Sequence, residues 1–65
     1  MQIMQLFVVS NSEGDYVSAW RDYGNAYAAA GECQAMDPEV CYSVETIEEE
    51  ELSDFWFYNP HLTVA

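Results

Sequence analysis

Hydrophobic and polar positions alternate in the first third of the chain, on both sides of a turn-forming segment. Residues 4–9 (MQLFVV) and residues 16–21 (YVSAWR) are rich in β-branched and aromatic side chains. Residues 10–15 between them are polar and include Gly14. Two such runs around a short glycine-containing segment predict a β-hairpin.

An alanine-rich segment, residues 26–36, follows the hairpin. Alanine is the best helix former, so this segment predicts a helix with Asn25 as its N-cap. Asp37 and Pro38 should end the helix, because the residue before a proline avoids helical geometry. Small and apolar residues recur at three- and four-residue steps and predict one narrow stripe that faces the sheet: Ala26, Ala29, Ala30, Cys33 and Met36.

The alternating pattern returns after the helix at residues 40–47 and predicts a third strand. Successive side chains of a strand point to opposite faces. Val40, Tyr42 and Val44 should therefore share one face, and Ser43 and Glu45 the other.

The remaining C-terminal segment is open to two interpretations. Residues 52–58 form either a helical turn, with Ser53 as its cap, or a fourth strand, which the aromatic run FWFY favours. Residues 61–65 are expected to be a tail or a short edge strand.

The order of these elements predicts an α+β fold, a small antiparallel sheet of three or four strands with one helix packed on a face (β-β-α-β and an uncertain C-terminal element). The 65 residues make a single domain, residues 1–65. A chain of this length buries only about 60% of the surface that its unfolded form exposes, and a homodimer would enlarge so thin a core. General disorder is excluded, because 51% of the residues are hydrophobic and 15% are aromatic.

The charge of the chain is strongly one-sided. Twelve residues are Asp or Glu and one, Arg21, is Lys or Arg, so the formal net charge is -11. Unbalanced charge repels itself and weakens the folded state, and ordinary small domains therefore mix both signs. A field this negative attracts positively charged partners, and extensively positive cellular surfaces are mostly those that bind nucleic acid. We therefore expect the partner to be a basic nucleic-acid-binding protein.

The sequence gives no sign of secretion or membrane insertion. Residues 1–5 lack the basic region that begins a secretion signal, and no apolar stretch approaches the roughly 20 residues that span a bilayer. A negative surface is also repelled by anionic lipid headgroups. We expect a cytoplasmic protein in which Cys33 and Cys41 are reduced, buried thiols rather than a disulfide.

No motif marks an active site, so the sequence predicts no catalytic residue, no metal site and no cofactor. The carboxylates are many, but none lies in an apolar segment that would tune it for acid–base catalysis. His61 and a Ser or Cys nucleophile lack a nucleophile elbow, and no phosphate-binding glycine loop or EF-hand pattern is present. Two cysteines and one histidine also fall short of the four ligands of a structural zinc site.

The acidic segment near the third strand is the first candidate binding site. If the strand continues through the glutamates, carboxylates on one face lie roughly 6–7 Å apart, twice the rise per residue, which is comparable with the phosphate spacing of nucleic acid. A solvated acidic turn is the alternative. The candidate residues are Glu45, Glu48, Glu49, Glu50, Glu51 and Asp54, with Glu13 and Asp15 at the hairpin tip adding to them.

The aromatic run at residues 55–58 is the second candidate. Four adjacent aromatic side chains cannot all face inward on a strand. We expect Phe55 and Phe57 to cover the sheet, and Trp56 and Tyr58 to anchor a partner at an interface. Stacking of these rings on nucleic-acid bases is excluded, because the chain has no positive groove for the phosphates.

In length, acidity, low cysteine content and strand-strand-helix-strand order, the chain resembles the small acidic inhibitors that bacteriophages direct against nucleic-acid enzymes: anti-CRISPR proteins, uracil-DNA glycosylase inhibitors and antirestriction proteins. The resemblance implies a DNA mimic whose carboxylates occupy the target's nucleic-acid-binding groove, and an anti-CRISPR protein is the leading instance. The alternative is a small interaction module or phage accessory protein that binds through aromatic contacts, with charge serving solubility.

Overall fold

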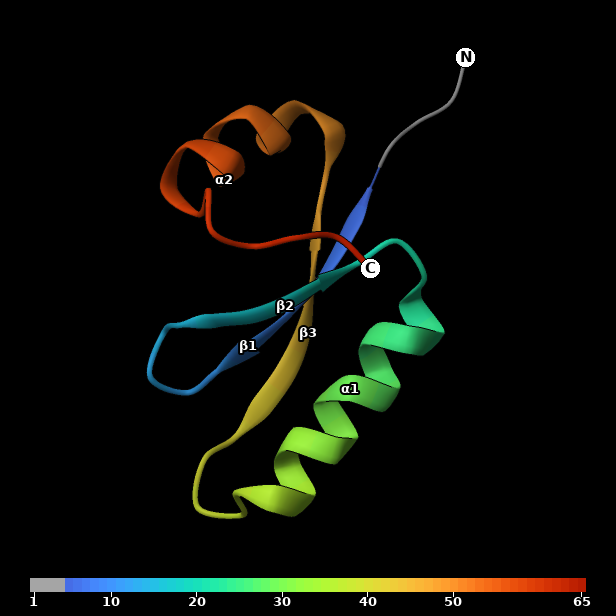
Figure 1. Cartoon of the computed structure of the whole chain (residues 1–65), viewed down its shortest axis with the longest axis vertical. Helices are drawn as coiled ribbons and strands as arrows, with labels where there is room; N and C mark the ends of the chain where they lie inside the picture. The colour runs from blue at the N-terminus through green and yellow to red at the C-terminus, as the bar shows by residue number, and fades with distance from the viewer. Residues whose placement is uncertain (1–4) are drawn as a thin grey trace.

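A three-stranded antiparallel sheet lies at the centre of the molecule, with a helix packed on each face (Figure 1). The computed structural model describes residues 5–65. The strand order is β2-β1-β3, which puts β1 in the middle. This arrangement confirms the predicted α+β class and adds a second helix. The elements are β1 (Leu6–Asn11), β2 (Tyr16–Trp20), α1 (Tyr23–Met36), β3 (Tyr42–Ile47), the 3-10 helix η1 (Glu49–Glu51) and α2 (Leu52–Tyr58).

The predicted hairpin is confirmed, with β1 reaching two residues further than the sequence pattern indicates. Residue 4 of the expected strand lies outside the described residues. The Asn11 side-chain oxygen accepts hydrogen bonds from the backbone N–H groups of Glu13 and Asp15, both at 3.0 Å. Gly14 has a φ of 89°, a conformation that residues with a Cβ rarely adopt. The turn therefore closes through one asparagine and one glycine.

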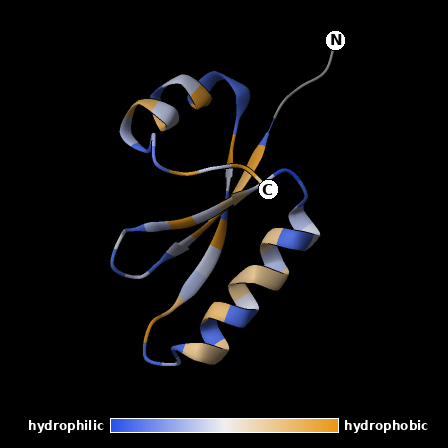
Figure 2. Cartoon of the chain, in the orientation of Figure 1, coloured by the Kyte–Doolittle hydropathy of each residue, from blue (hydrophilic) through white to orange (hydrophobic). Residues whose placement is uncertain are grey.

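Alternation along β1 divides the core into two clusters. Leu6 and Val8 face α2, where they pack with Ala19, Ile47 and Phe55. Val9 faces the other way and packs with Ala26 and Ala30 of α1. Figure 2 shows the hydrophobic colour along β1 and the hydrophilic colour at the corner between β3 and α2. The central strand is therefore covered on both faces.

Helix α1 is confirmed, but it begins three residues earlier than predicted. Asp22, rather than Asn25, is the N-cap, because its carboxylate accepts a hydrogen bond from the Asn25 backbone N–H at 3.0 Å. The predicted small-residue stripe holds at Ala26 and Ala30, which are buried. Met36 departs from it, since this residue is 87% exposed in the last turn.

The end of α1 is joined to β3 by one side chain. The Gln34 amide nitrogen donates to the Val40 carbonyl at 2.7 Å, and its oxygen accepts from the Tyr42 backbone N–H at 3.1 Å. Because these bonds hold residues 40–42 against the helix, β3 begins at Tyr42 instead of Val40. Tyr42 and Val44 share a face, as the alternation predicted, and that face packs on α1.

The third strand does not continue through the glutamates. This corrects the expectation of an extended row of carboxylates on one face of that strand. β3 ends at Ile47, and the Glu48 backbone N–H donates to the Glu51 carboxylate at 3.2 Å. This contact belongs to a capping box between Glu48 and Glu51, an arrangement that starts a helix. Residues 52–58 are accordingly a helix, and Ser53 lies inside it rather than capping it.

The C-terminal residues form a tail, one of the two expectations, and this tail touches the sheet edge through a single bridge. Val64 makes a parallel bridge to Ala19 of β2. The Ala65 N–H donates to the Ala19 carbonyl at 3.0 Å, and the Arg21 N–H donates to the Ala65 carbonyl at 3.1 Å. Leu62 and Val64 pack against the α2-side core, so this segment closes one edge of it.

Candidate functional site

Five carboxylates gather where β3 gives way to α2, and we call this group the acidic corner: Glu48, Glu49, Glu50, Glu51 and Asp54. All except the half-buried Glu48 are exposed. A 3-10 helix has three residues per turn, so the side chains of Glu49, Glu50 and Glu51 point in three directions. The corner is therefore a fan of carboxylates and not a linear row.

Two of these glutamates also have structural contacts. Glu48 accepts two hydrogen bonds from the Gln5 side-chain amide, at 3.0 and 3.1 Å. Glu51 accepts from the Glu48 backbone, as described above. The positive end of a helix dipole also favours acidic residues in the first turn, by about 0.3–1 kcal/mol each. Local helix formation thus accounts for part of the corner.

The other predicted acidic residues do not join the corner. Glu45 lies on β3 opposite Val8, exposed on the sheet face that α2 partly covers. Glu13 and Asp15 lie in the hairpin turn, at the far end of the six-residue strand β1. That strand is about 20 Å long. The acidic corner and the hairpin carboxylates therefore lie at the two ends of the sheet, with Glu45 between them.

The hairpin turn instead approaches the loop between α1 and β3. The Cys41 backbone N–H donates to the Ser12 hydroxyl at 3.4 Å. The pKa of Tyr42 is raised at this end of the molecule. Desolvation of the Tyr42 side chain is the largest cause, followed by the nearby charges of Asp37, Cys33 and Glu13. Negative charge therefore collects at this end of the molecule as well.

Helix α2 sorts the four aromatic residues differently from a strand. Phe55 is 6% exposed, and its ring centroid lies 5.1 Å from that of the half-buried Trp56. Phe57 and Tyr58 are each 75% exposed, with ring centroids 5.1 Å apart. The expectation of an exposed anchor agrees with Tyr58, whereas Phe57 is exposed and does not cover the sheet. Trp56 packs against the core and presents only part of its ring.

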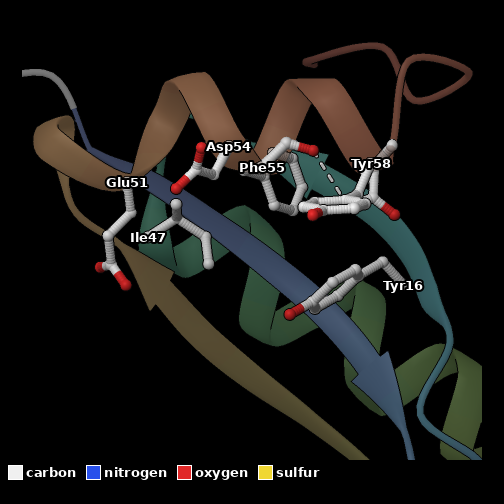
Figure 3. A pocket seen from close by; sticks show the side chains of 7 residues that line it. Tyr16, Ile47, Glu51, Asp54, Phe55 and Tyr58 are labelled. Carbon is white, nitrogen blue, oxygen red and sulfur yellow. Dashed lines mark hydrogen bonds between the residues drawn. The ribbon is translucent and has the colours of Figure 1, made fainter.

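An open groove of about 270 Å³ lies between α2 and the sheet (Figure 3), and we call it the α2 groove. Tyr16 of β2 and Ile47 of β3 lie on the sheet side, with Phe55 and Tyr58 on the helix side. The Tyr16 and Phe55 ring centroids are 5.3 Å apart in an edge-to-face arrangement. Glu51, Asp54 and Asn59 complete the lining, so the groove joins the acidic corner to the exposed aromatic residues.

Sequence reasoning missed the groove, and it favoured core packing for a second aromatic pair that the structure leaves exposed. Tyr23 and Tyr27 on α1 are 52% and 66% exposed, with ring centroids 6.2 Å apart. The exposure of Phe57 had a detectable signal. Leu52, Phe55 and Trp56 follow a three- to four-residue step, which in a helix places Phe57 on the opposite side.

The cysteines do not combine into a site. Both thiols are free; Cys33 is half-buried and Cys41 is exposed, which corrects the expectation that both are buried. Within residues 5–65, no group of three or more His, Cys, Asp or Glu side chains is placed to hold a metal ion. The same range contains no helix with the length and apolar character needed to cross a membrane.

Comparisons of the chain with protein-family models, with curated proteins and with solved structures found no match.

Proposed function

We propose that the protein is a non-enzymatic inhibitor, a DNA mimic that binds the basic nucleic-acid-binding surface of another protein. CRISPR effectors are the first target class, and the inhibitor would act in the cytoplasm of a bacterial host. The acidic corner carries the proposal, because five carboxylates lie within seven residues of a chain that has one arginine and no lysine. A basic groove that meets this corner would release counterions, as it does on binding nucleic acid.

Glu49 and Glu50 are the residues that best support binding over folding. Both are exposed, and both lie outside the hydrogen bonds that hold Glu48 and Glu51. Tyr58 lies on the adjoining helix and offers an aromatic anchor beside the charge. Electrostatics would set the association rate and the choice of partner, and the anchor would slow dissociation.

The test is competition with nucleic acid on a panel of purified enzymes, with CRISPR effectors first. The double variant E49K/E50K should weaken competition by about tenfold or more and lower the salt slope by about two, since each reversed site loses an ion contact. E32K/E39K is the matched control, because it changes two exposed carboxylates elsewhere and gives the same net charge. Thermal unfolding of each variant checks that it is folded.

Equal effects of the two double variants would contradict the proposal, because total charge and not the corner would then control competition. Competition that no salt concentration changes would also contradict it. E49Q/E50Q serves as a milder pair, since lysine at a helix start is unfavourable to the dipole.

A second candidate function is an interaction module that binds through aromatic contacts, with charge serving solubility. The observation in its favour is the exposure of Phe57 and Tyr58, each 75%. For such a module, F57A/Y58A should abolish binding of the partner, and salt should change the affinity little. Tyr58 serves as an anchor in both candidates, so they differ in the effect of E49K/E50K and in how strongly salt changes the affinity.

A further inference from the structure

The α2 groove combines aromatic walls with carboxylates. Its walls are aromatic, with Tyr16 on the sheet and Tyr58 on the helix, and Ile47 adds an apolar side chain. Glu51 and Asp54 place carboxylates at the same groove, as Figure 3 shows. A ligand that matches it needs a positive charge and a flat surface that stacks on rings.

An arginine side chain has both properties. Its guanidinium group is planar, pairs with carboxylates through two parallel hydrogen bonds, and stacks on aromatic faces. A lysine ammonium carries the same charge, but it is more strongly hydrated and has no flat face. The groove chemistry therefore favours arginine over lysine.

The size of the groove fits one long side chain. Pockets for drug-sized ligands span roughly 300–1,000 Å³, and the groove volume is about 270 Å³, just below that range. The chain cannot supply the occupant from its own strand β2. Its single arginine, Arg21, follows the end of this strand, about 16 Å along the chain from Tyr16 at the start. The cation must come from another molecule.

We propose that the α2 groove binds an arginine side chain of the partner protein. The guanidinium group stacks between Tyr16 and Tyr58 and pairs with Asp54, one helical turn from Tyr58, while Glu51 adds negative charge at the far end of the groove. This inference rests on the proposed function, since it names the residue type that a basic target surface inserts beside the acidic corner. The groove then supplies specificity that a fan of exposed carboxylates lacks.

The probe is the peptide acetyl-Gly-Arg-Gly-amide, titrated into the isotope-labelled full chain and followed by two-dimensional NMR. The peptide with lysine in place of arginine is the charge-matched comparison. We expect shifts concentrated at the groove residues and a dissociation constant at least about fivefold lower for the arginine peptide, because only its guanidinium group stacks and pairs in a bidentate manner.

Two variants test the lining. E51Q/D54N removes both carboxylates, and glutamine at position 51 retains an oxygen that can accept the Glu48 N–H. It should raise the dissociation constant of the arginine peptide about tenfold, because the carboxylate that pairs with the guanidinium group and a second negative charge of the groove are both lost. E13Q/D15N removes the same charge from the hairpin turn and should leave binding within about twofold, since charges a strand length away are screened. Y58L should reduce the preference for arginine over lysine.

Equal binding of the two peptides, or shifts spread over every carboxylate, would overturn the arginine site. So would equal losses in E51Q/D54N and E13Q/D15N. If the arginine site fails while E49K/E50K still weakens competition with nucleic acid, the proposed function stands without it. If the arginine peptide binds the groove but no nucleic-acid enzyme is inhibited, the site stands and the proposed function falls.

Discussion

Phe55 and Phe57 are two positions apart in the sequence, but one is buried and the other is exposed. Truncating each of them therefore tests the structure of α2. Phe55 is 6% exposed and Phe57 is 75% exposed. In a strand, residues two apart share a face, and both truncations would have similar effects. In the helix observed, the two side chains point to different sides, and their effects should differ widely.

Phe55→Ala should destabilise the fold severely. Its ring packs with Leu6, Val8 and Ile47, and it also contacts Tyr16 and Trp56 edge to face. Truncation of a buried phenylalanine costs about 3–5 kcal/mol. At about 0.05–0.15 kcal/mol per residue, a chain of this length has a total stability of about 3–10 kcal/mol. The variant should therefore lose a third or more of its stability, or fail to fold.

Phe57→Ala is the matched control and should change the free energy of unfolding by less than about 0.5 kcal/mol, as surface substitutions usually do. Urea unfolding followed by tryptophan fluorescence measures both variants. Trp56 contacts Phe55 directly and reports on α2, and far-ultraviolet circular dichroism reports on α1. Equal destabilisation by the two substitutions would refute the helical assignment of residues 52–58.

Three further predictions concern the connections between elements. Gln34→Ala should destabilise the fold by about 1–3 kcal/mol in urea unfolding, because it removes both hydrogen bonds between α1 and the start of β3; an unchanged midpoint would contradict this role. Asp22→Ala should lower stability by about 1 kcal/mol through loss of the N-cap, whereas Asn25→Ala should have less effect, and the reverse order would contradict the assigned cap. The raised pKa of Tyr42 means that the folded state holds the phenol proton more tightly than the unfolded state. Its contribution to stability is complete below the unfolded pKa of about 10 and is lost as the pH rises through the folded pKa. Above a pH of about 10, the free energy of unfolding of the wild type should therefore fall more steeply than that of Tyr42→Phe. Parallel pH profiles of the two proteins would contradict the raised pKa.

Local signals in the sequence were enough for the hairpin, α1 and β3. Alternation identified the strands, and the proline after Asp37 fixed the end of α1. The start of α1 was predicted wrongly because Asp22 and Asn25 are both good N-caps, and only the hydrogen bond to the Asn25 N–H distinguishes them. Residues 52–58 stayed open because aromatic side chains favour strands, while the capping contact that starts the helix involves Glu48 and Glu51 outside that segment.

The candidate site was less accessible to sequence reasoning, because its parts come from distant positions. Tyr16 and Phe55 are 39 residues apart in the sequence, and they meet only because α2 packs on the sheet. The hairpin carboxylates could not be placed relative to the glutamates until the register of β1 and β3 was known. That register pairs Asn11 with Tyr42 and Leu6 with Ile47, and so puts Glu13 and Glu48 at opposite ends of the sheet.

The residues of the acidic corner divide by role, and this division decides where a functional test should act. Glu48 and Glu51 belong to the start of the helix, since one binds Gln5 and the other accepts the Glu48 N–H. Selection for folding alone would retain these two. The helix dipole favours Glu49 and Glu50, but a neutral residue there would sacrifice only about 0.3–1 kcal/mol. Each of these negative charges also adds to the repulsion in a chain of net charge -11, so the helix dipole gives only a weak reason for their presence. The proposed binding to a basic partner would account for it, which makes Glu49 and Glu50 the residues whose reversal separates inhibition from stability.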